Sequence, residues 1–394
     1  MRSRRVAALA ALALAAAGCS SSSAPEQVAS LRAATGPPNV VRIGLADLLW
    51  PLEPERAKTR DQLVVARLLF STPLRTDVNG NLRPGLCTSW HSTGTLLRLR
   101  CTHAGAIATQ LRRTGLEPGA WARKGQLMVR SSERDLAYRL TEPRAAPPGV
   151  PGPFRLISAS PTRIVAERKG VRFELRKLEP FRALQLFRAG KLDEAPVPLG
   201  DVRATKLDPQ LAPALRVRRL LAADAVIFDR SISRKVRGVY DDTADRADFQ
   251  ALVPEFEAPP AEDLRQRGKP SASQAAIALR EARKRIPSLP KLAVGFAPGS
   301  DPTLAYGTNL LVAAWRDLGL GAHVGADDAQ LVRLAAAYPK LSALTAYGRA
   351  NALVPIAWVA DARLVSPRLR GWREDELGSV DYSRVRPRAP SRRR

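Results

Sequence analysis

Cysteine and histidine side chains are the first candidates for chemistry, since the 394-residue chain holds only three of each. Cys87 and Cys101 lie fourteen positions apart, and His91 and His103 lie at even offsets from them. Even offsets along a strand place side chains on one face of a sheet, so a Cys2His2 metal site is one interpretation. Its spacings, C-x3-H and C-x-H, do not match the usual zinc patterns. A disulfide and a pair of free thiols are the alternatives.

The segment between these cysteines favours the disulfide. Trp90-His91 and Leu96 to Arg100 predict two strands around the turn Ser92 to Thr95, and a hairpin centred on residue 94 sets Cys87 directly opposite Cys101. Facing positions of an antiparallel pair have the short separation that a disulfide requires. The export signal described below places both thiols in an oxidising compartment, so we predict that they are paired.

Enzyme motifs are absent from the sequence. It contains no GxxxxGK[ST], GxGxxG, HExxH or GxSxG pattern, which are the usual signs of phosphate-binding, dinucleotide-binding, metalloprotease and hydrolase sites. The pairs Asp241-Asp242 and Asp327-Asp328 are adjacent in sequence and would diverge on a helix, whereas general acid–base catalysis needs carboxyl groups that face one gap. We expect neither catalysis nor a cofactor.

The composition describes a folded, basic protein. Hydrophobic residues make up 45% of the chain, enough to bury a sizeable core, and the formal net charge is +26. Such a charge favours anionic surroundings. The arginines are spread along the whole chain rather than gathered in a stripe with aromatic residues, so we expect a solvated basic surface and no specific nucleic-acid binding.

The N-terminus predicts export. Arg2, Arg4 and Arg5 precede the apolar run 6–17 and the small residues before Cys19, the arrangement of a secretion signal whose apolar run is too short to span a bilayer. Ala16-Ala17-Gly18-Cys19 resembles the lipobox of bacterial lipoproteins, which implies lipidation of Cys19 and attachment to the outer face of the cell membrane. A plain signal peptide cut near Ala17 is the alternative. The Ser- and Pro-rich segment that follows has the composition of a tether.

The remaining chain alternates predicted strands and helices, which indicates an α/β fold. Pro180 to Arg188 is predicted as a helix with Phe181, Leu184 and Phe187 on one face, and Asn309 to Leu318 as a helix with Leu311 and Trp315 inward. Residues 104–150 show no clear pattern. The further predicted strands are 39–47, 154–157, 163–169, 171–178, 224–229, 292–296 and 354–359, and the further helices are 61–70 and 271–285.

Several segments, in order, resemble the family 5 extracellular solute-binding proteins, which deliver oligopeptides, dipeptides, nickel complexes and related solutes to ABC permeases. The similar segments are RIGLADLLWPLEP (42–54), LLFSTPLRTDVNGNLRPGLCTSWHSTGTLLRLRC (68–101), GPFRLI (152–157), FRAGKLDEAPVPLGDV (187–202), VRGVYDDTADRADFQALV (236–253) and VPIAWVADARLVSPRLRGW (354–372). Each motif is weak alone, and their order behind a lipobox carries the resemblance.

The resemblance implies a two-lobed, periplasmic-binding-protein-like clamp of type II with a discontinuous large lobe. A solute would bind between the lobes and close them about hinge crossings at 224–229 and 350–355. The implied division is a signal peptide at 1–18, a lipidated tether at 19–38, the large lobe at 39–225 and 350–385, the smaller lobe at 226–349, and a disordered basic tail at 386–394.

Candidate ligand-binding residues follow from position within this resemblance. They are Asp47, Trp50, Ser71, Thr72, Phe228, Tyr347 and Trp358. For each of them a place in the core or in a turn is the alternative. Relatives carry an Asp-Tyr-x-Asp-Pro-like turn that holds the peptide amino terminus, and here Ala337-Tyr338-Pro339 has no aspartate beside it, which puts peptide binding in doubt.

The function expected is that of a substrate-binding lipoprotein of an ABC uptake transporter. It would capture a peptide-like or other small solute, act as a monomer, and deliver the solute to permease subunits. The alternative is a structural or interaction lipoprotein that keeps the fold, has lost solute binding with the shortened smaller lobe, and engages a protein partner or an anionic envelope polymer through its basic surface.

Overall fold

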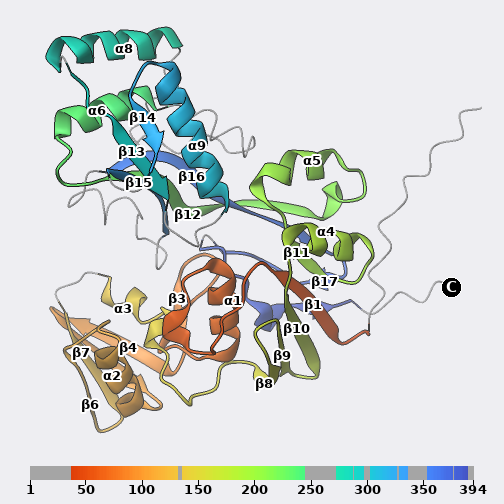
Figure 1. The fold of residues 1–394 in the computed structure, drawn as a ribbon. Coiled ribbons are helices and arrows are strands. Elements are labelled where there is room, and N and C mark those ends of the chain that lie inside the picture. The colour runs from red at the N-terminus through yellow and green to blue at the C-terminus, as the bar shows by residue number, and fades with distance from the viewer. Residues whose placement is uncertain are drawn as a thin grey trace, which may run out of the picture.

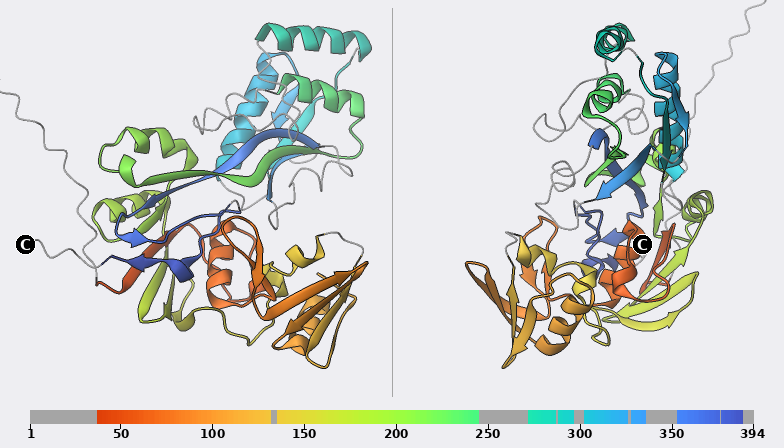
Figure 2. Two further views of the ribbon diagram at one scale, coloured as in Figure 1. Left: turned by 180° about the vertical axis from the view of Figure 1, so that it is seen from behind. Right: turned by 60° about the vertical axis from the view of Figure 1, so that its left-hand side comes forward.

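A computed structural model describes residues 37–131, 135–244, 272–286, 288–296, 302–325, 328–335, 353–375 and 377–388 (Figure 1). The fold is mixed α/β and has two lobes, as the sequence predicts, and two long strands pass between them (Figure 2). The helices are α1 Arg60–Leu69, α2 Ala104–Arg113, α3 Leu136–Arg139, α4 Pro180–Arg188, α5 Val202–Leu207, α6 Arg234–Thr243, α8 Ala272–Arg285 and α9 Pro302–Asp317.

One sheet of ten strands runs through both lobes in the order β14-β13-β15-β12-β16-β11-β1-β10-β9-β8. Its strands are β1 Val40–Leu45, β8 Arg155–Ala159, β9 Arg163–Arg168, β10 Val171–Lys177, β11 Glu194–Pro196, β12 Leu215–Phe228, β13 Leu292–Phe296, β14 Ala322–Val324, β15 Ala329–Ala335 and β16 Leu353–Val365. The antiparallel pair β12 and β16 forms the middle of the sheet and is the connection between the lobes.

Three smaller sheets complete the structure. β4 Cys87–Thr93, β5 Leu96–Cys101, β7 Gln126–Arg130 and β6 Ala120–Arg123 form a four-stranded sheet, β2 Leu74–Thr76 pairs with β3 Leu82–Pro84, and β17 Leu369–Arg370 pairs with β18 Arg386–Pro387. The four-stranded sheet packs on α2 and has its own hydrophobic core, which includes Leu99, Ile107 and Leu127. Helix α2 and strands β6 and β7 of this unit lie in the stretch 104–150, in which the sequence shows no clear pattern.

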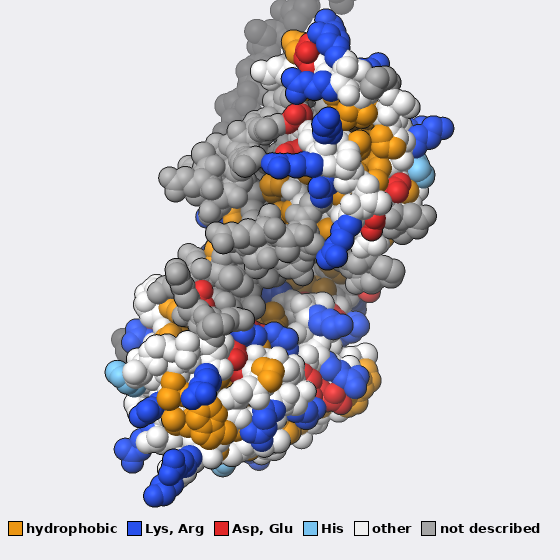
Figure 3. Space-filling view, turned by 90° about the vertical axis from the view of Figure 1, so that its left-hand side faces the viewer, with side chains coloured by type: hydrophobic (Ala, Val, Ile, Leu, Met, Phe, Trp, Pro, Cys, Tyr) orange, Lys and Arg blue, Asp and Glu red, His pale blue; other side chains and the backbone are white. Residues whose placement is uncertain are grey.

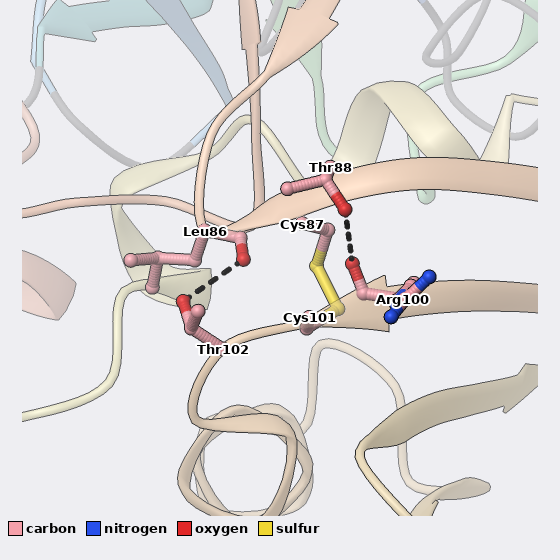
Figure 4. Close-up of a disulfide and its surroundings, with 6 residues drawn as sticks. All are labelled: Leu86, Cys87, Thr88, Arg100, Cys101 and Thr102. Carbon is pink, nitrogen blue, oxygen red and sulfur yellow. Dashed lines mark hydrogen bonds between the residues drawn. A yellow bond between two sulfur atoms is a disulfide. The ribbon is translucent and has the colours of Figure 1, made fainter.

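The disulfide Cys87–Cys101 is present, and Figure 4 shows it across the start of the hairpin β4–β5. The hairpin is not centred on residue 94, because Thr93 pairs with Leu96 and Trp90 with Leu99. A β-bulge between Cys87 and Ser89 corrects this one-residue shift. The predicted pairing is therefore confirmed, although the bulge that produces it was not foreseen.

The same bulge excludes the predicted face shared by cysteines and histidines. Beyond it, the side chains on the face of Cys101 belong to Trp90 and Ser92, whereas His91 pairs with Arg98 on the opposite face. His103 lies past the end of β5 and precedes α2 in a left-handed conformation. Within the described residues, no group of three or more His, Cys, Asp or Glu side chains could hold a metal ion.

Helix α4 buries a different face from the one predicted. Its buried side chains are Ala183, Leu186 and Phe187, while Phe181 is 72% exposed. Apolar residues three positions apart can belong to either of two neighbouring faces of a helix. Packing against β11 buries the face that is centred between Ala183 and Phe187. Phe181 at the first turn is left in solvent.

Three boundaries also differ from the sequence prediction. Helix α9 begins at Pro302 rather than Asn309, and proline is favourable at a first helical position. Strand β12 begins nine residues earlier than predicted, with Arg216 and Arg218 exposed along it. The segment predicted to be a disordered tail from residue 386 pairs with β17 through β18, and the Arg388 amide donates to the carbonyl of Arg368.

Candidate functional site

The loop after β1 is held by a buried carboxylate on α1. Asp61 accepts a hydrogen bond from the backbone N–H of Ala46 at 2.7 Å and an ion-pair bond from Arg363 at 2.5 Å. Asp61 is 7% exposed, and this burial raises the pKa of its carboxyl group. The nearby Arg60 guanidinium lowers the pKa and opposes the effect of burial. The position of residues 46–50 is therefore fixed by the large-lobe core.

Asp47 lies next in this loop and is held at the surface. Its carboxylate accepts from Gln62 Nε2 at 2.6 Å and from Lys177 Nζ at 3.2 Å, and its side chain is 32% exposed. Gln62 is itself placed by the capping box at the start of α1, in which it exchanges hydrogen bonds with Thr59. Trp50, three residues further on, is 48% exposed.

The candidates that follow α1 are less accessible. Thr72 is 8% exposed, and its hydroxyl donates to the carbonyl of Leu74 at 2.6 Å, while Ser71 is half-buried. Phe228 is 3% exposed, and its ring packs 6.2 Å from that of Tyr240 in the smaller-lobe core. Thr72 and Phe228 thus each make contacts within their own lobe, and their part in ligand binding stays a prediction.

Trp358 lies on β16 where that strand crosses between the lobes. Its ring is half-buried and packs against the cluster of Ala223, Ala225 and Leu334, and the guanidinium of Arg219 on β12 lies 5.3 Å from the ring centroid. The indole Nε1 is buried and, within the part of the chain that the structure describes, has no hydrogen-bond partner. An unsatisfied buried donor costs about 1–3 kcal/mol, so this N–H is a donor that a bound acceptor would satisfy.

A network of buried charges lies under the loop after β1 and joins segments far apart in sequence. Arg363, 1% exposed, contacts Asp61, Glu194 at 3.1 Å and Asp361 at 3.1 Å. Glu194 also accepts hydrogen bonds from Tyr382 at 2.8 Å and from Trp372 at 2.8 Å. Burial raises the pKa of Glu194 to about 7, although these donors oppose the shift.

The network is richer in acids than in bases. Arg60 lies 2.7 Å from Asp361 and also contacts Glu374 and Asp61. Four carboxyl groups, those of Asp61, Glu194, Asp361 and Glu374, thus share two guanidinium groups. Burial and the neighbouring Glu374 raise the pKa of Asp361 well above its ordinary value, against the opposing effect of Arg60. These residues connect α1, β11, β16 and the C-terminal segment, which is a structural role.

Four residues that the sequence prediction did not name are a charged contact of Asp47, a charged contact of Trp358, and two exposed aromatic residues of the smaller lobe. Lys177 ends β10, Arg219 lies in the part of β12 that was not predicted, and Phe296 and Tyr306 are 37% and 55% exposed at the end of β13 and the start of α9. The alternation of Arg216, Val217 and Arg218 is a strand signal that could have led to Arg219. The pairing of Lys177 with Asp47 has no local signal.

One hollow among the described residues lies in the smaller lobe and is not lined by the crossing strands. A cavity of about 350 Å³ lies between α8 and α9 and is lined by Ala276, Leu279, Arg280, Arg283, Asp317 and Leu318. No helix in the described ranges is long and apolar enough to cross a membrane. Cys19, Tyr347 and the segment Ala337 to Pro339 lie outside the described residues.

Comparison with known proteins gives matches in structure only. No protein-family model matches the sequence, and no curated protein matches it. Among solved structures, OppA of Haemophilus influenzae in complex with the peptide RPPGFSPFR has a TM-score of 0.70 at 13% identity, covering 89% of this chain and 99% of that one. The chain has the fold of a periplasmic solute-binding protein.

Two further structures with this fold bind different solutes. The pheromone receptor PrgZ, described with its mode of peptide binding, has a TM-score of 0.70 at 12% identity, covering 89% of this chain and 100% of that one. NikZ of Campylobacter jejuni, in complex with Ni(L-His), has a TM-score of 0.66 at 13% identity, with the same coverage. These structural neighbours are binding proteins rather than enzymes.

Proposed function

We propose that this chain is an extracytoplasmic solute-binding lipoprotein of family 5, which captures a small solute between its lobes and delivers it to an ABC permease. The observation that carries the proposal is the two-lobed sheet with two crossing strands, matched by OppA over 89% of the chain. The ordered sequence motifs and the lipobox at Cys19 support the same conclusion. In this proposal β12 and β16 are the hinge.

The solute would lie against the crossing strands, near the Arg219 guanidinium and the buried indole N–H of Trp358, which has no partner among the described residues. Asp47, Lys177 and Trp50 would border it from the large lobe, and Phe296 and Tyr306 from the smaller lobe. This combination of hydrogen-bond donors, one carboxylate and aromatic surface suits a zwitterionic or acidic solute of the size of a short peptide.

A thermal-shift screen of the chain from Ser20 to Arg394 tests the proposal, with short peptides, metal chelates, sugars and polyamines as solutes. A solute that binds only the native state raises the melting temperature in proportion to the logarithm of its concentration. We expect a saturable shift with one solute class, and silence with all classes would contradict the proposal.

The contact with Trp358 can be tested by the variant Trp358→Phe, which keeps a ring and removes the N–H. We expect at least tenfold weaker solute binding by calorimetry, equivalent to the ~1.4 kcal/mol of one hydrogen bond. Trp121→Phe is the matched control, because Trp121 is also half-buried but lies on the four-stranded sheet. Equal binding by both variants would remove Trp358 from the site.

A second candidate function is that of an interaction lipoprotein that engages an anionic surface. The observation that favours it is a face of the four-stranded sheet on which four arginines are exposed, as described in the next subsection. The two functions are compatible, because that face and the crossing strands belong to different parts of the fold (Figure 1).

A further inference from the structure

The four-stranded sheet has one covered and one open face. Leu97, Leu99, Leu127 and Val129 alternate along β5 and β7, are at most 3% exposed, and share a hydrophobic core with α2. The side chains between them point to the opposite face. There Arg98, Arg100, Arg123 and Arg130 are all exposed.

The strand register shows how these four arginines are arranged. Arg98 is paired with Met128, and Met128 with Trp121 on the next strand. On one side of this row, Arg100, Gln126 and Arg123 form a second row, and on the other side Leu96 is paired with Arg130. With strands ~4.8 Å apart, four strands make a platform ~14 Å wide. The arginines thus surround a small apolar centre.

This platform belongs to a basic part of the chain. Between residues 78 and 131 the chain holds eight basic residues and one acidic residue, Glu117, which is only 3% exposed. No carboxylate of the described chain pairs with any of the four arginines, and the Arg130 guanidinium lies 6.0 Å from the centre of the Trp121 ring. Figure 3 shows, on this side of the molecule, a group of hydrophobic side chains bordered by Lys and Arg.

We propose that this arginine platform binds the surface of a bilayer that contains anionic phospholipids. Guanidinium groups form paired hydrogen bonds with phosphate oxygens. Tryptophan and the aliphatic stems of arginine are favourable at the level of the lipid headgroups, where apolar and charged surroundings meet. An open sheet face with charges around an apolar centre suits an extended anionic surface. An extended acidic peptide segment would instead be expected in a groove.

This inference rests on the proposed membrane attachment for its biological setting, because a lipid on Cys19 would bring the platform within reach of a membrane. Twenty residues, 20–39, separate Cys19 from β1, and at ~3.5 Å each they span at most about 70 Å. The platform would then orient the body on the membrane surface, in addition to the anchor.

The test is sedimentation of the unlipidated chain, Ser20 to Arg394, with vesicles of phosphatidylcholine containing 30% phosphatidylglycerol, so that binding does not depend on the anchor. We expect binding at low salt that falls at least tenfold at high salt, because the attraction is screened. Vesicles of phosphatidylcholine alone should bind at least tenfold less. Absence of a difference between the two vesicle types would overturn the proposal.

A variant with Arg98, Arg100, Arg123 and Arg130 changed to Gln should lose at least thirtyfold in vesicle binding. The control changes four other exposed arginines to Gln, which keeps the same net charge; these are Arg172, Arg203, Arg218 and Arg370. An equal loss in both would assign binding to overall charge and overturn the proposal, as would binding of soluble polyglutamate in preference to vesicles. Solute-induced thermal shifts of both variants should stay unchanged, so failure here is distinguishable from failure of the proposed function.

Discussion

Replacing Arg363 by Met tests whether the buried charge network holds the large lobe together. The methionine keeps an apolar side chain of similar length and removes the guanidinium that contacts Asp61, Glu194 and Asp361. Three carboxyl groups then lose a partner, and two of them, those of Asp61 and Glu194, are buried. Removing one member of a buried ion pair costs about 3–5 kcal/mol, so we expect the free energy of unfolding at pH 7 to fall by about that amount.

The pH dependence separates this electrostatic loss from a packing defect. Without Arg363 the folded-state pKa values of these carboxyl groups rise further above their unfolded values. The folded variant therefore binds protons more strongly than its unfolded chain does, and its stability increases as the pH falls. We expect the deficit relative to the wild type to shrink between pH 7 and pH 5.

Urea unfolding followed by circular dichroism at pH 5, 6 and 7 is the assay, with Arg216→Met as the control. Arg216 is exposed on β12, and among the described residues it donates only to the backbone carbonyls of Pro213 and Leu215, so its loss should change stability by no more than about 0.5 kcal/mol. A deficit below about 1 kcal/mol for Arg363→Met, or one that does not change with pH, would refute the reasoning.

Three more changes have expected outcomes. Replacing Cys87 and Cys101 by Ser opens a loop with a sequence separation of 14, which should lower the free energy of unfolding by about 3 kcal/mol; urea unfolding of the variant and of the oxidised wild type measures it, and equal midpoints would contradict it. Glu194 has a folded-state pKa of about 7 against an ordinary 4.5, so the stability that its protonation contributes is complete below pH 4.5 and is lost as the pH rises through 7. Glu194→Gln should therefore flatten the dependence of the free energy of unfolding on pH across that range, by on the order of 3 kcal/mol. An unchanged slope of the free energy of unfolding against pH would argue against the shift. Gly152→Ala would place a Cβ 2.4 Å from the backbone carbon of Leu69, so we expect a fall in melting temperature, whereas Gly105→Ala, with open space around it, should leave the melting temperature within about 1 °C of the wild type.

Local patterns were sufficient for much of the fold. The strands β1, β9, β10 and β13 and the helices α1 and α8 lie within one or two residues of their predicted ranges, because each has apolar periodicity with clear turn residues around it. Helix α2 has no such boundary: it follows His103 in a left-handed conformation, without a side-chain cap. The usual sign of a helix start is missing there.

The candidate site was predicted less completely, since its contacts join distant segments. Asp47 and Trp358 could be named from their positions in the resemblance, but Lys177 lies 130 residues from Asp47, and Arg219 lies 139 residues from Trp358. Such pairs depend on the register of the central sheet. The register of β12 with β16 shifts between Arg219 and Ala223 and again after Asp224, and a bulge of this kind leaves no periodic signal in the sequence.

The shared sheet also limits how such a protein can be recombined. Strand β12 pairs with β16 along nearly its whole length, so that its first half completes the large lobe and its second half pairs with β15 in the smaller lobe. A smaller lobe grafted from a relative would have to bring the matching smaller-lobe halves of both β12 and β16. The junctions between the two proteins would lie at the two register shifts of this strand pair. Exchange of the stretch between β13 and β15 alone would give a lobe whose sheet is foreign to the strands it must pair with.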